Sequence, residues 1–192
     1  MKRNKIIFFS ILFILIVIFA FVIYPYYGNK PYTENNGQFS FADGTYIING
    51  QKTTLKDGLS EVDIASSSSK IITRYFGNDV KHDFDGDGRE DIVFLLTQET
   101  GGSGVFYYVV ARLNTVNGPV GSDAILLGDR IAPQSTVMDE GTTRKNVIVV
   151  NYADRNSGEP MTTKPSLGKS IWLKLDTKTM QFGEVAQNFE GE

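Results

Sequence analysis

The feature that most constrains this chain is an uncharged apolar segment close to its amino terminus. From Ile6 to Tyr24 the sequence reads IIFFSILFILIVIFAFVIY, in which Ser10 is the only interruption. As a helix this segment would be about 28 Å long, close to the roughly 30 Å hydrocarbon core of a bilayer. We therefore predict a single transmembrane anchor over residues 6–24.

The residues before this segment predict how it is oriented. Residues 1–5 form a basic flank that contains Lys2, Arg3 and Lys5. Positive flanks tend to remain in the cytoplasm, so we expect the carboxyl-terminal part of the chain outside the cell. The alternative is a signal peptide cleaved after Ala20, which would leave the protein secreted. A signal peptide has a shorter apolar region, typically about 7 to 15 residues, so we favour the retained anchor.

Charge and composition exclude several function classes for the rest of the chain. Three of the 19 basic residues precede the apolar segment and none of the 22 acidic residues does, which leaves 16 basic against 22 acidic side chains. This negative balance disfavours nucleic acid as a partner, because phosphates need clustered cations. The absence of Cys excludes disulfides, thiol nucleophiles and thiolate metal sites. With His82 as its single His, the chain cannot build a zinc site that needs two imidazoles.

Turn signals and apolar patterns after the anchor predict one mainly β domain. Residues 25–39 are polar and rich in Gly and Asn, so we expect a linker, followed by an extracytoplasmic domain over residues 40–192. Asn49-Gly50 is a type I′ turn signal and predicts a hairpin over residues 45–55. We expect seven to nine strands and at most one short helix, arranged as an antiparallel sheet or as a small sandwich or barrel; a β-rich α+β fold is the alternative. The further predicted strands are residues 70–76, 91–97, 105–113, 124–127, 147–152 and 171–175.

The segment from Asp91 to Thr97 is the strongest strand signal. Ile92, Phe94 and Leu96 would lie on one face of a strand, and Val93 and Leu95 on the other. Since both faces are apolar, this strand should be buried on both sides.

The sequence HDFDGDGRED, which directly precedes that strand, is the most specific motif in the chain. It places Asp83, Asp85, Asp87 and Asp91 at loop positions 1, 3, 5 and 9, with Gly88 at position 6 and Arg89 at position 7. Carboxylates spaced so closely repel one another unless a cation lies among them, and calcium takes six to eight oxygen ligands. We predict one calcium ion held by side-chain oxygens of Asp83, Asp85 and Asp87 and by the backbone carbonyl of Arg89, with Asp91 closing the shell directly or through water. The alternative is an acidic turn that binds nothing.

The pattern Asp83-x-Asp85-x-Asp87-Gly88-x-x-Asp91 resembles the loops of FG-GAP and VCBS repeats, found in integrin-like propellers and many bacterial surface proteins. Those propellers repeat the motif, whereas this chain carries it once. The resemblance therefore implies a calcium loop between strands without a propeller. Segments such as TRYFGN and LGDRIAP also look like parts of uncharacterised envelope or secreted bacterial proteins, a resemblance over roughly residues 44–192 that implies no particular activity.

These observations predict a non-catalytic domain at the cell membrane that is stabilised by calcium and has a binding or a structural role in the cell envelope. For a binding role, the partner would be an envelope protein or a glycan. Two other functions stay open at this point. One is an envelope hydrolase that uses an Asp/Glu pair as general acid and base, although no spacing in the sequence singles out such a pair. The other is an accessory subunit of a membrane complex. The sequence identifies no ligand, oligomeric state or biological process.

Overall fold

The computed structural model describes residues 42–65, 67–139 and 145–186, and these residues form antiparallel β-sheets without a helix. The mainly β fold predicted from the sequence is therefore confirmed. The predicted transmembrane anchor and linker, residues 6–39, lie outside the described residues. The described part of the chain contains twelve strands, more than the seven to nine predicted: β1 Gly44–Ile48, β2 Gln51–Leu55, β3 Leu59–Asp63, β4 Lys70–His82, β5 Asp91–Glu99, β6 Phe106–Thr115, β7 Gly118–Gly121, β8 Ile125–Asp129, β9 Ala132–Met138, β10 Val147–Asp154, β11 Leu167–Asp176 and β12 Gln181–Glu184.

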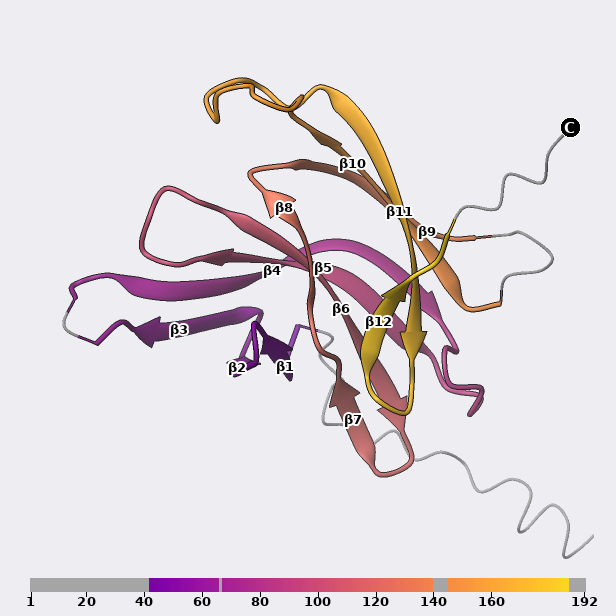
Figure 1. Ribbon diagram of the computed structural model, residues 1–192. Coiled ribbons are helices and arrows are strands. Elements are labelled where there is room, and N and C mark those ends of the chain that lie inside the picture. Colours follow the sequence, from indigo (N-terminus) through magenta and orange to yellow (C-terminus); the bar gives the residue numbers. More distant parts are fainter. Residues whose placement is uncertain (1–41, 66, 140–144, 187–192) are drawn as a thin grey trace, which may run out of the picture. The chain divides into compact units, whose positions relative to one another are not determined.

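The strands belong to three sheets, which can be followed in Figure 1. The largest has the order β3-β4-β5-β6-β7, with β8 also pairing with β6. The carboxyl-terminal sheet has the order β12-β11-β10-β9, and β1 and β2 form a separate hairpin. This hairpin turns at Asn49 and Gly50, whose φ angles of 51° and 78° are the positive values that the type I′ prediction requires.

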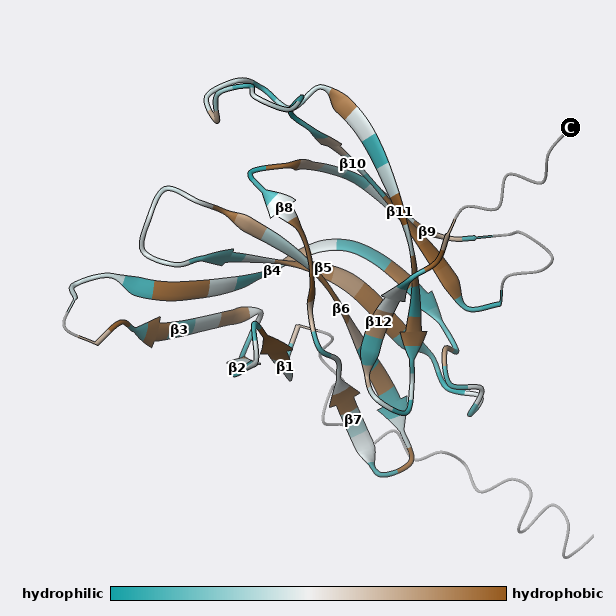
Figure 2. Cartoon of the chain, in the orientation of Figure 1, coloured by the Kyte–Doolittle hydropathy of each residue, from teal (hydrophilic) through white to brown (hydrophobic). Residues whose placement is uncertain are grey.

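Strand β5 is buried on both faces, as its sequence predicts. Val93 and Leu95 pack in a cluster with residues of β10 and β11, such as Ile148 and Leu173. On the other face, Phe94 and its even-numbered neighbours pack against buried side chains of the β1–β2 hairpin. Hydrophobic residues accordingly gather on the strands that cross the middle of the domain, while the connecting turns are mostly white or teal in Figure 2. The central strand thus holds two cores together.

Close backbone contact seats the β1–β2 hairpin on the large sheet. A Cβ atom at Gly121 of β7 would collide with the backbone oxygen of Thr45 and lie 3.0 Å from two ring atoms of Tyr46. Tyr46 itself is fully buried, and its ring meets that of Phe94 edge to face at 5.7 Å. Only glycine permits this approach at position 121.

Strand β4 is longer than the predicted segment 70–76, because a bulge breaks its apolar alternation. The pairing with β5 shifts register on both sides of Gly77, where Gly77 and Asn78 have φ angles of 107° and 56°. Beyond the bulge β4 continues to His82, which pairs with Asp91 of β5. The acidic loop is therefore the connection of a long β4–β5 hairpin.

Candidate metal centre

Two glycines shape the β4–β5 loop. Gly86 and Gly88 have φ angles of 80° and 84°, in the left-handed region where side chains other than glycine are strained. Gly88, at position 6 of the loop, allows one sharp bend, and Gly86 adds a second one. No atom lies within 4 Å of the place where a Cβ would stand at either glycine, so the backbone conformation, rather than space, favours glycine here.

Asp83 organises the first half of the loop through backbone amides. Its Oδ1 accepts hydrogen bonds from the N–H groups of Gly86 and Asp87 at 2.7 and 3.1 Å, and its Oδ2 accepts one from Gly88 at 2.9 Å. These bonds, that from Gly88 foremost, lower the pKa of Asp83, because N–H donors stabilise the charged carboxylate. The loop thus wraps around an ionised Asp83.

Asp91 closes the loop from a buried position at the start of β5. The residue is fully buried, and its Oδ2 and Oδ1 accept hydrogen bonds from the N–H groups of Phe84 at 2.9 Å and Asn114 at 2.8 Å. Loss of solvation raises the pKa of Asp91, and this effect outweighs the two hydrogen bonds, which lower it. The negative charges of Asp85 and Asp87 raise the pKa further. The charged form of Asp91 is therefore disfavoured where no cation accompanies it.

Three of the four predicted carboxylates converge on one point. Asp83, Asp85 and Asp91 each offer a carboxylate oxygen, and these atoms all lie within 4.8 Å of one another. The oxygens that coordinate one calcium ion lie about 2.3 to 2.6 Å from it. They are therefore separated from one another by distances similar to those between these three carboxylate oxygens. The donor set, carboxylate oxygens alone, suits a hard cation such as calcium or magnesium.

Asp87 points elsewhere, which the sequence did not predict. Its Oδ2 pairs with Nη1 of Arg89 at 2.5 Å, and its Oδ1 accepts the backbone N–H of Arg89 at 2.9 Å. Residues two apart in a tight turn are close enough for such a pair. The spacing of Asp87 and Arg89 could therefore have indicated their ion pair. The predicted role of the Arg89 carbonyl as a ligand stays a prediction.

Asn146 is a residue of the loop environment that the sequence analysis missed. Its Nδ2 donates to the backbone oxygen of Phe84 at 2.8 Å, and its Oδ1 lies 3.3 Å from Nε2 of His82. The ring of His82 also meets that of Phe84 edge to face, with centroids 5.3 Å apart. Asn146 is 62 positions away from Phe84 in the sequence, so no local pattern could have identified it.

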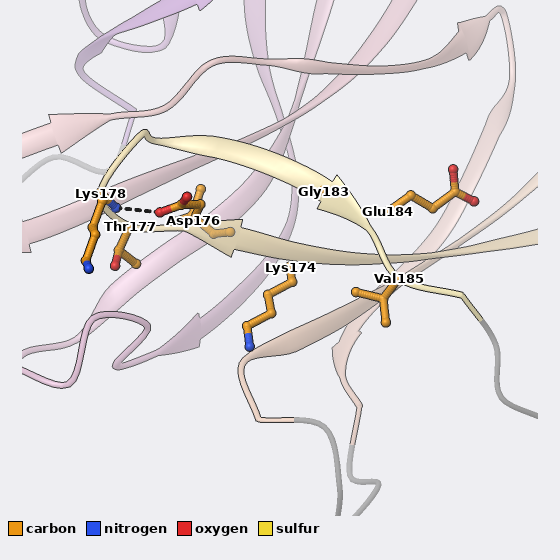
Figure 3. A pocket seen from close by; sticks show the side chains of 8 residues that line it. Lys174, Asp176, Thr177, Lys178, Gly183, Glu184 and Val185 are labelled. Carbon is orange, nitrogen blue, oxygen red and sulfur yellow. Dashed lines mark hydrogen bonds between the residues drawn. The ribbon is translucent and has the colours of Figure 1, made fainter.

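A second candidate feature is an open pocket of about 510 Å³ beside the β11–β12 turn. Lysines and carboxylates both line it, so its charge favours neither anions nor cations. Asp176 and Glu184 are the two carboxylates that an acid/base mechanism would need. Asp176 accepts the backbone N–H of Lys178 at 2.9 Å, and Figure 3 shows the two carboxylates pointing away from each other.

Comparison with known proteins adds no family to these observations. The chain matches no family model, no curated protein and no solved structure. Within the residues that the structure describes, no helix has the length and hydrophobicity to cross a membrane, and the apolar segment 6–24 is outside them.

Proposed function

We propose that residues 40–192 form a non-catalytic, calcium-stabilised domain that a membrane anchor holds outside the cell, where it binds an envelope component. The observation that carries the calcium part is the convergence of oxygens from Asp83, Asp85 and Asp91 within 4.8 Å, one of them from a buried residue. The membrane part rests on the apolar segment Ile6 to Tyr24 and on the basic residues before it.

A divalent cation offsets the electrostatic cost of this loop. Burial disfavours the charge of Asp91, and the neighbouring carboxylates add repulsion. An ion among the three Asp side chains would replace that repulsion by attraction. Calcium fits better than magnesium, because magnesium keeps its own waters and demands near-octahedral geometry.

Two further ligands complete the proposed shell. Arg89 contributes its backbone carbonyl, and Asp87 joins after leaving its pair with the guanidinium of Arg89. Exposed ion pairs of this kind contribute little, so the rearrangement opposes binding only weakly. We expect a dissociation constant of about 10⁻⁴ to 10⁻³ M, as in extracellular calcium modules.

Thermal unfolding of the full chain with and without calcium tests this proposal. At 10 mM calcium such an affinity adds about 1.4 to 2.7 kcal/mol to the free energy of unfolding, so the melting temperature should rise by several degrees relative to a chelator. Asp85→Ala should remove the response. Asp63→Ala, which changes an exposed Asp on β3, is the control and should retain it. Equal melting of the parent chain in calcium and in chelator would refute the calcium site.

A further inference from the structure

Asn146 connects the acidic loop to the carboxyl-terminal sheet. It directly precedes β10, and its side chain holds the backbone oxygen of Phe84 at 2.8 Å and contacts His82 at 3.3 Å. Both residues flank Asp83, the first residue of the loop. A side chain at the entry of the carboxyl-terminal sheet therefore contacts the entry of a loop that connects two strands of the large sheet.

Phe84 extends this connection to the closing residue of the loop. Its N–H donates to Asp91 at 2.9 Å, while its carbonyl accepts from Asn146. Phe84 is 4% exposed and packs in the core cluster that includes Ile148 of β10. The backbone of Phe84 thus links Asp91, through its N–H, to Asn146, through its carbonyl.

We infer that Asn146 is a positioning residue that couples cation binding in the loop to the carboxyl-terminal sheet, an inference that rests on the calcium site proposed above. An ion that draws Asp83 and Asp91 together restrains Phe84 between them, which holds its carbonyl against Asn146. Such coupling is reciprocal, so the Asn146 contact in turn raises the affinity of the loop for a divalent cation.

A glycine substitution isolates the side chain of Asn146 from its backbone. The φ angle of Asn146 is 58°, a conformation that glycine adopts freely and alanine does not. Asn146→Gly therefore removes the amide group without straining the chain. Asn49→Gly is a matched control, because Asn49 has a φ angle of 51° and its Nδ2 donates to the Tyr108 hydroxyl at 3.0 Å in the β1–β2 hairpin.

Calcium titration calorimetry of the full chain measures the effect on affinity. Loss of the Asn146 hydrogen bonds to Phe84 and His82 should weaken calcium binding by about threefold to tenfold in Asn146→Gly. The Asn49→Gly control should bind within about twofold of the parent chain, because its lost bond is remote from the loop.

Hydrogen exchange on the same proteins distinguishes coupling from general destabilisation. Calcium should slow exchange of the β10 amides in the parent chain and in Asn49→Gly, and this response should be lost in Asn146→Gly. Calcium binding and β10 protection that are unchanged in Asn146→Gly would overturn the inference while leaving the calcium site intact. A parent chain that does not respond to calcium at all would overturn both.

Discussion

The two ends of the acidic loop hold their carboxylates in opposite ways. Asp83 lies at the solvent side, where three backbone N–H groups surround it and lower its pKa. Asp91 lies fully buried at the start of β5, where desolvation raises its pKa against two hydrogen bonds. The negative charge of Asp83 is therefore stabilised by its surroundings, whereas that of Asp91 is not. A cation between the two would stabilise the charge of Asp91 more than that of Asp83.

The largest effect that separates the two ends is expected from alanine substitutions in calcium-free solution. Asp91→Ala leaves the N–H groups of Phe84 and Asn114 without an acceptor in a buried place, so it should lower the free energy of unfolding by about 3 kcal/mol. Asp83→Ala should cost clearly less, because water can solvate the amides that it frees. Urea denaturation measures the free energy of unfolding of both variants. Equal losses would contradict the assignment of different environments to Asp83 and Asp91.

Glycine substitution tests the bend between the two ends and should have a smaller effect. Gly88→Ala places a side chain at a φ angle of 84° and should cost about 1 kcal/mol. Gly168→Ala in β11 is the control, because that glycine does not have a positive φ angle and has open space around it. The control should be neutral or slightly stabilising in the same denaturation experiment; a neutral Gly88→Ala would mean that the bend is not strained.

The smallest expected effect is a pH dependence of opposite sign for the two carboxylates. The folded pKa of Asp83 lies below its unfolded value, so its contribution to stability is present above about pH 4 and is lost as the pH falls through the folded pKa. The folded pKa of Asp91 lies above its unfolded value, so its charge opposes folding at neutral pH, and this opposition is relieved as the pH falls toward about 4.

Comparison of the parent chain with Asp83→Asn and Asp91→Asn, without calcium, measures these two signs. On acidification from pH 7 toward about 4, the parent chain should gain stability relative to Asp91→Asn. Below about pH 4 it should lose stability relative to Asp83→Asn. The same sign for both variants would contradict the assignment of the two environments.

Local sequence signals predicted the centre of the fold well. The two apolar faces of residues 91–97 identified the strand that both cores share, and Asn49-Gly50 identified a hairpin with its turn type. These features succeed because they depend on periods of two residues or on a single turn. The position of the acidic loop between two strands followed from the same signals.

Features that depend on tertiary contact could not be predicted. Strand β7 reads GPVG, which carries turn residues and no apolar alternation, and it exists through pairing with β6. The bulge at Gly77 concealed the second half of β4. In the candidate site, the contact of Asn146 with Phe84 joins residues 62 positions apart, which residue spacing does not encode.

A crystal structure of the protein grown in millimolar calcium, with anomalous data, would test the proposed calcium site itself. We expect one anomalous peak bounded by Asp83, Asp85 and Asp91, with carboxylate oxygens at about 2.3 to 2.6 Å from it. Well-defined density in which these three side chains surround only water, with no anomalous signal, would contradict it.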